Sequence, residues 1–284
     1  MPDPIREIVI QDLSELIQVV TPSRPDPASG RLRERAVYRG VPDTGYSLLT
    51  SLARVGVPDR EPHSKVHLEE HLLRNFIRYS RPHLSVAPVN DWEVLIVAQH
   101  HGLPTRLLDW THSPLVAAHF ATVNEGRPSD RVIWRLDWGA MHDYYGLPPL
   151  ALMVHELDAV LEKRGITSLW QLVTDQARLE EPLIALLEPP ALDGRITSQA
   201  STFTFPTDRT RAIDELLAEA GLSRCLTRIQ IPYSAVERVR DQLDLCGVDE
   251  RRLFPDLDGV AAEMRRYYSA SGLDPSRPLD EQQD

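Results

Sequence analysis

The residues from Gln99 to Thr111 have the side chains best suited to chemistry in this chain. The segment reads Gln-His-His-Gly-Leu-Pro-Thr-Arg-Leu-Leu-Asp-Trp-Thr, so imidazoles, a guanidinium, a carboxylate and an indole follow one another closely. A glycine and a proline interrupt it, which disfavours a regular helix or strand. Polar groups held on a bent backbone are typical of binding sites, so we expect this segment to contact a ligand.

The two adjacent histidines, His100 and His101, cannot both face one point, because neighbouring side chains diverge. We expect His101, beside Gly102, to face the ligand, and His100 to pack or to orient its neighbours. A metal site would need Asp109 or His112 as a third ligand. No cysteine lies nearby, so we expect no metal here.

The second half of the segment has two interpretations at each residue. Arg106 and Asp109 either contact a ligand or form an ion pair with each other that braces the loop. Trp110 either offers a flat face for an aromatic ring or belongs to the core. Thr111 either bonds a ligand oxygen or caps the next helix. The capping role is favoured only if Ser113 is not itself the cap.

Two further residues outside this segment have suitable chemistry. Arg39 closes a short β-type run at residues 36–41, and its guanidinium can bond a phosphate in two places. Gly40 beside it would let a ligand approach the backbone; the alternative for Arg39 is an ion pair at a strand end. Gln199 lies in a run at residues 195–205 that alternates like a strand, where it bonds either a ligand or neighbouring backbone.

The elements that must position these residues alternate between the two periodicities. Helical spacing or a helix start is found at residues 65–79, 91–100 (with Asp91 as N-cap), 113–121, 155–164, 167–174, 211–220, 234–246 and 257–268. Strand-like runs are found at 36–41, 131–137, 195–205 and 226–231. We therefore expect one α+β domain over residues 31–268, with an N-terminal arm or extension at 1–30 and a flexible tail at 269–284.

Composition describes an ordinary globular chain of 284 residues with 42% hydrophobic residues and a net charge of −11. No apolar run is long enough to span a bilayer, and the charged N-terminus lacks a signal-peptide core, so we expect a cytoplasmic protein without membrane contact. Cys225 and Cys246 are expected to be free thiols. The negative charge disfavours a broad nucleic-acid surface, although every basic residue except Lys65 and Lys163 is Arg.

Three segments together resemble the FRG domain, a bacterial family named for a Phe/Tyr-Arg-Gly motif. The first is Tyr38-Arg39-Gly40, with Tyr in place of Phe, and the second is Gln99–Thr111 with the helix that follows. The third comprises 229–232 and 253–259, where Asp256 or Asp258 would cap the last helix. The resemblance covers most of residues 36–265.

The order of these motifs is also similar to that of ADP-ribosyltransferases. Arg39 matches the first-strand Arg, Trp110-Thr111 precedes a helix with Ala117–Ala121, and Gln199 takes the third-strand position, where many such enzymes have Glu. The resemblance implies a mixed β core flanked by helices, NAD as co-substrate and no metal. It makes Arg39, His101 and Gln199 catalytic, and assigns NAD binding to Arg39, Gly40, His101, Gly102, Arg106, Asp109, Trp110 and Thr111.

A glutamine at that position cannot act as an anionic base, which favours an acceptor that is already nucleophilic, such as a nucleic-acid base. We expect single-stranded DNA before RNA, with a local basic groove from Arg31, Arg33, Arg35, Arg39, Arg78 and Arg81. The resemblance implies a toxin or phage-defence effector, with an antitoxin or an ADP-ribosyl hydrolase as counterpart. The alternatives are a protein acceptor, a non-catalytic nucleotide- or nucleic-acid-binding module, and a metal-dependent hydrolase using His100, His101 and Asp109.

Overall fold

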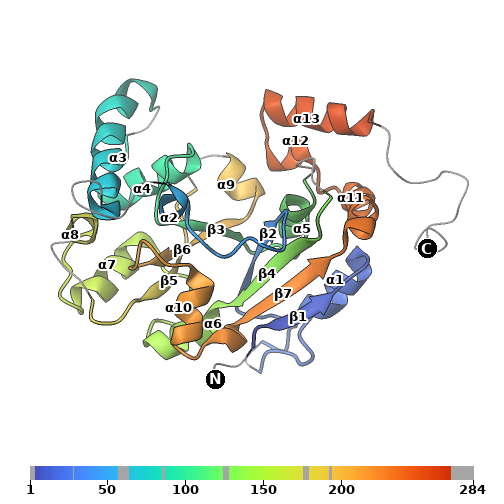
Figure 1. Ribbon diagram of the computed structural model, residues 1–284, viewed down its shortest axis with the longest axis horizontal. Coiled ribbons are helices and arrows are strands. Elements are labelled where there is room, and N and C mark those ends of the chain that lie inside the picture. Colours follow the sequence, from blue (N-terminus) through green and yellow to red (C-terminus); the bar gives the residue numbers. More distant parts are fainter. Residues whose placement is uncertain are drawn as a thin grey trace, which may run out of the picture.

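A computed structural model describes residues 4–27, 29–56, 64–84, 87–123, 128–174, 179–191 and 194–269. Within these ranges seven strands form one sheet in the order β1-β7-β4-β2-β3-β6-β5, with β1 and β7 parallel and the other neighbours antiparallel. Helices flank the sheet (Figure 1), which confirms the expected α+β class with a mixed β core. The strands are β1 (Arg6–Val9), β2 (Ala36–Val41), β3 (Leu108–Thr111), β4 (Arg131–Asp137), β5 (Ile184–Leu187), β6 (Ser201–Pro206) and β7 (Leu226–Ile231).

The helices between the strands largely follow the periodic segments of the sequence. The α-helices are α1 (Leu13–Val20), α2 (Ser51–Arg54), α3 (Lys65–Ser80), α4 (Asp91–His100), α5 (Pro114–Thr122), α6 (Trp138–Tyr145), α7 (Val154–Glu162), α8 (Leu169–Val173), α9 (Gly194–Ser198), α10 (Ile213–Glu219), α11 (Val236–Leu245), α12 (Glu250–Leu253) and α13 (Leu257–Tyr267). Short 3-10 turns are η1 (Arg81–His83), η2 (Ser223–Cys225) and η3 (Tyr233–Ala235).

Alternation along the strands divides the core between the two faces of the sheet. Tyr38, Ile133 and Ile229 share a cluster with buried residues of α1, α5 and α11. Their chain neighbours point to the other face, where Val37 and Trp134 pack with residues of α6 and α10. At the β6 and β5 end a third cluster joins the strands to α3, α4, α7 and α8.

The N-terminal segment, expected as an arm or extension, contributes an edge strand and a helix to this fold. β1 pairs along β7, and Ile10, Leu13 and Leu16 are buried. The expected flexible tail at 269–284 lies, apart from Ser269, outside the described residues. Cys225 and Cys246 are both free.

Helix ends follow capping rules with one change of residue. Ser113 caps α5 by accepting from the Val116 N–H, with a proline in the first turn, as the sequence predicts. Asp256 caps α13 in the same way. The cap of α4 is Asn90 and not Asp91, because the Asn90 side chain accepts from Glu93 N at 2.9 Å.

The run at 195–205 is not one strand. Residues 194–198 form α9, and β6 starts only at Ser201. Ala200 between them has φ 46°, a left-handed conformation that separates the helical turn from the strand. The prediction that Gln199 lies on a strand is therefore wrong.

Candidate functional site

The sheet opens between the central strand β2 and its neighbour β3. These strands pair at one position, Tyr38 with Thr111, whereas β2 pairs with β4 at six. Beyond that position the Arg39 guanidinium spans the opening, with its Nη1 donating to the Asp109 carbonyl oxygen at 2.7 Å. The same nitrogen lies 3.6 Å from the Asp109 carboxylate. Arg39 and Asp109, two residues singled out by the sequence, are thus brought together.

Asp109 is unusually accessible for its place in the fold. β3 lies between β2 and β6, yet the Asp109 side chain is 55% exposed while the other three β3 residues are buried. On one side its β6 partner Phe203 belongs to the cluster under α4 and α7. On the other side α5 packs on β2 at Gly40. The carboxylate therefore marks an uncovered position between two groups of helices.

A chain of hydrogen bonds holds the Asp109 carboxylate in place. Gln99 Nε2 donates to Asp109 Oδ2 at 2.9 Å, and Gln99 Oε1 accepts from Thr105 Oγ1 at 2.5 Å. Thr105 in turn exchanges backbone hydrogen bonds with the Ser51 hydroxyl of α2. Gln99 is the first residue of the segment 99–111, and no role was predicted for it. Its position near the end of α4 directs its side chain towards the carboxylate.

Arg39 is the more enclosed member of the pair, with a side chain 19% exposed. Burial lowers the pKa of its guanidinium, and the Asp109 carboxylate opposes this shift. The nearby Arg54 lowers the pKa further. A cation whose charge is only partly compensated by one carboxylate and one carbonyl can accept an additional anionic partner such as a phosphate.

Arg106 does not pair with Asp109, contrary to one interpretation of their spacing. Its side chain is fully buried and donates from Nε to Glu69 Oε1 at 2.6 Å, with a second, shorter contact from Nη2 to Glu69 Oε2. Arg209 approaches the same carboxylate at 3.8 Å. Arg106 braces the core and cannot reach a ligand from this position.

Trp110 is a core residue. Its side chain is buried, and Nε1 donates to Thr204 Oγ1 at 2.9 Å. Thr111 donates to the carbonyl of Gln199 at 2.7 Å and accepts from Ser113 N, so it fastens β3 to the turn before β6. Both side chains have hydrogen-bond partners within the protein, and Trp110 is part of the buried core.

Gly40 allows close approach of a helix and not of a ligand. A Cβ placed on Gly40 would lie 1.9 Å from the carbonyl oxygen of Ala117 in α5. Gly102 has φ 80° and open space around it, so its role is to end α4. His101 precedes it with an exposed side chain, and its ring meets that of His100 edge to face at 5.2 Å.

Gln199 is tied to the C-terminal part of the chain. Its Nε2 donates to the carbonyl of Leu253, at the end of α12, at 3.0 Å. The amide therefore connects α9 to the segment 253–259 that the sequence singled out. As placed, it does not act on the Arg39 and Asp109 pair.

The arginines expected to line a groove lie in different parts of the molecule. Arg35 pairs with Asp143 of α6 at 2.9 Å, whereas Arg78 and Arg81 lie at the far end of α3 and in η1. In Figure 1 α3 lies at the upper left and α6 near the lower edge of the molecule. The prediction of one groove is wrong.

The described residues contain no group of three or more His, Cys, Asp or Glu side chains that could hold a metal ion, so His100, His101 and Asp109 do not form a ligand set. Within the same residues no helix is long and apolar enough to cross a bilayer.

Comparison with family models gives a match in this region of the chain. The family model of the FRG domain matches residues 34–130, the family that the motifs predicted. The matched segment contains Arg39, Gln99 and Asp109. No curated protein and no solved structure matches the chain.

Proposed function

We propose that this FRG-domain protein is an NAD-dependent ADP-ribosyltransferase whose site is the opening between β2 and β3. The observation that carries the proposal is the Arg39–Asp109 pair, held at an uncovered position of an interior strand. A guanidinium bonds pyrophosphate oxygens in two places. The carboxylate, oriented by Gln99, can accept from ribose hydroxyls.

In the reaction, the bond between the nicotinamide nitrogen and ribose C1′ breaks, and nicotinamide leaves with the electron pair. The lone pair of an acceptor nitrogen forms the new bond to C1′, and a proton of the acceptor passes to solvent. The ribose centre is cation-like in the transition state, as in glycoside cleavage. The charge on Asp109 would stabilise it, and the exposed His101 would relay the acceptor's proton to solvent or orient the acceptor.

We take the acceptor to be a nucleic-acid base, in single-stranded DNA before RNA, because a base nitrogen is already nucleophilic and needs no anionic base to activate it. Such an enzyme would serve as a toxin or phage-defence effector and would need an antitoxin or an ADP-ribosyl hydrolase as counterpart. A protein acceptor forms a separate arm of the experiment.

The experiment incubates the chain with NAD labelled in its adenylate phosphate and with single-stranded DNA, duplex DNA, RNA or protein. Nicotinamide release and label transfer are both measured. Asp109→Asn removes the charge but keeps the shape, and we expect it to slow transfer on the order of 100-fold.

The matched control is Asp143→Asn, since Asp143 is 59% exposed and also pairs with an arginine, Arg35, at 2.9 Å. It should leave transfer unchanged. Absence of nicotinamide release in every mixture would refute the proposal, and NAD or nucleic-acid binding without turnover would identify a non-catalytic binding module.

A further inference from the structure

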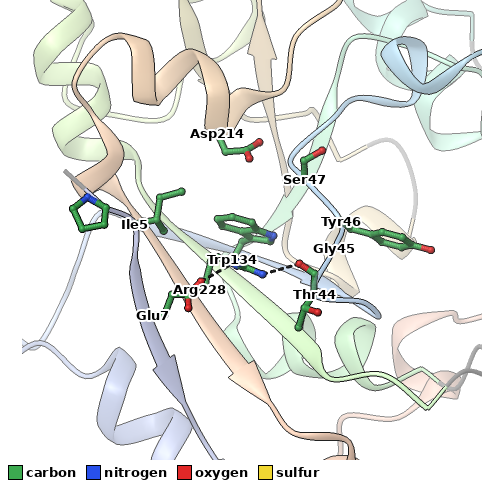
Figure 2. Close-up of a pocket in the computed structure, with 10 residues that line it drawn as sticks. Ile5, Glu7, Thr44, Gly45, Tyr46, Ser47, Trp134, Asp214 and Arg228 are labelled. Carbon is green, nitrogen blue, oxygen red and sulfur yellow. Dashed lines mark hydrogen bonds and ion pairs between the residues drawn. The ribbon is translucent and has the colours of Figure 1, made fainter. Parts of the chain in front are cut away.

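A row of polar and aromatic side chains crosses four strands beside the proposed site. Arg39, Trp134, Arg228 and Glu7 are successive register partners on β2, β4, β7 and β1, so they lie on one face of the sheet. Over the last three of them lies a pocket of about 590 Å³. Its other walls come from the N-terminal segment, the loop after β2 and α10 (Figure 2), and contain Pro4, Ile5, Thr44, Gly45, Tyr46, Ser47 and Asp214.

The floor of this pocket contains two buried donors without partners. Trp134 is 3% exposed, and its Nε1 has no hydrogen-bond partner; the same is true of Arg228 Nε. An unsatisfied buried donor costs a folded protein stability, so two of them lining one pocket call for an explanation. Figure 2 shows the nitrogen-bearing edge of the indole facing the loop with Thr44 and Ser47.

The remaining contacts of Arg228 hold it rigidly. Nη1 donates to Glu7 Oε1 at 2.8 Å and Nη2 to the Thr44 carbonyl at 2.6 Å, while the guanidinium lies 5.3 Å from the centre of the Trp134 ring. Its charge is thereby compensated by Glu7. The pocket is thus a poor place for a phosphate, which would need an unpaired cation.

The opposite side of the pocket holds a hydrogen-bond acceptor, the Asp214 carboxylate. Asp214 Oδ1 accepts from Leu48 N at 2.9 Å, and burial raises the pKa of the carboxyl group. In Figure 2 the indole of Trp134 lies between Asp214 and Arg228. A ligand in the pocket therefore meets N–H donors at the sheet and a carboxylate at α10.

We propose that this pocket binds an uncharged nucleobase or its nucleoside. A ring carbonyl or ring nitrogen would accept from Trp134 Nε1, and an adjacent amino or imino group would donate to Asp214. A flat ring suits a pocket lined by Trp134, Tyr46 and Ile5, and the volume is in the range usual for small-molecule sites. The inference does not depend on transfer activity, because binding is measured without NAD.

The experiment measures binding of guanosine, cytidine, adenosine and uridine to the full chain by calorimetry. Purine riboside, which lacks exocyclic groups, serves as the reference ligand. We expect at least one of the four nucleosides to bind more tightly than purine riboside. A single-stranded oligonucleotide is tested in parallel. If the oligonucleotide binds and the free nucleosides do not, the pocket recognises a base within a polynucleotide.

Two variants test the assigned contacts. Trp134→Phe removes the indole N–H and should weaken binding roughly three- to tenfold. In Asp214→Asn the side chain can still accept from Leu48 N, but its amide NH2 group would face the ligand in place of an acceptor. This variant should weaken nucleoside binding to a similar extent. The control is Trp170→Phe in α8, which makes the same chemical change away from the pocket and should leave the affinity unchanged.

The proposal is overturned if no nucleoside and no oligonucleotide binds saturably below about 1 mM, or if Trp134→Phe and Asp214→Asn bind as tightly as the parent chain. If the chain binds a nucleoside but shows no transfer of ADP-ribose, the proposed function is refuted and the pocket proposal stands.

Discussion

At the scale of single residues, two arginines that the sequence singles out have opposite roles. Arg39 reaches an uncovered carboxylate, whereas Arg106 is sealed in the core against Glu69. The spacing of Arg106 and Asp109 suggested a local pair. The partner of Arg106 instead lies 37 residues earlier, on α3, and only tertiary packing brings it close.

The Glu69 carboxylate should be a major determinant of stability. In Glu69→Gln the side chain keeps its size, but the buried Arg106 and the neighbouring Arg209 lose their counter-charge. Breaking a buried pair in this way costs about 3–5 kcal/mol, which urea unfolding at pH 7 would show as a lower free energy of unfolding.

The adjacent residue supplies the control for this experiment. Glu70 pairs with Arg74 on the surface at 3.2 Å, one turn along the same helix. Glu70→Gln should cost no more than about 0.5 kcal/mol. Similar losses in the two variants would show that the Glu69 pair contributes nothing beyond a surface pair.

At the scale of elements, alternation and capping predicted most of the fold. The strands at 36–41, 131–137 and 226–231 have the predicted bounds. β5 was missed, because its four apolar residues are too few to show a period. α6 was missed because Asp137 both ends β4 and caps the helix, which leaves no loop to mark the change.

The packing of α5 on β2 explains the glycine of the Tyr-Arg-Gly motif. In Gly40→Ala the new methyl group would meet the backbone of α5 at Ala117 O and Ala121 N, which cannot rotate away. We expect the free energy of unfolding to fall by about 1–3 kcal/mol, measured by urea denaturation.

Gly56→Ala is the comparison, since a Cβ at Gly56 meets nothing within 4 Å. It should leave stability unchanged or raise it by up to about 1 kcal/mol. A Gly40→Ala chain as stable as Gly56→Ala would mean that α5 can move off the strand, and that the glycine is required for another reason.

At the scale of the whole molecule, residue types singled out the segments of the candidate site but did not show how those segments meet. The motifs around Arg39 and Asp109 were identified from residue types, and the structure joins them through β2 and β3. The pocket over Trp134 was missed, because its walls come from β1, β4, β7, α10 and a loop that are far apart along the chain. No local pattern links such residues.

The sheet order also predicts that residues 34–130, which match the family model, cannot fold alone. Residues 34–130 supply β2 and β3, which pair at a single position, whereas β4, on the other side of β2, starts at Arg131. Without β4 and β6 the outer edges of β2 and β3 would lose their backbone hydrogen-bond partners. Two strands with so little pairing cannot form a stable sheet.

A fragment of residues 34–130 should therefore show no cooperative thermal unfolding, whereas a chain of residues 4–269 should unfold in one transition. Circular dichroism and dispersion of amide resonances would measure both. Removing only residues 4–20 from the longer chain provides an intermediate test, because it exposes the β7 edge and the cluster around Leu16. A cooperative transition in the 34–130 fragment would contradict this expectation. It would show that residues 34–130 fold as a unit without the remaining strands of the sheet.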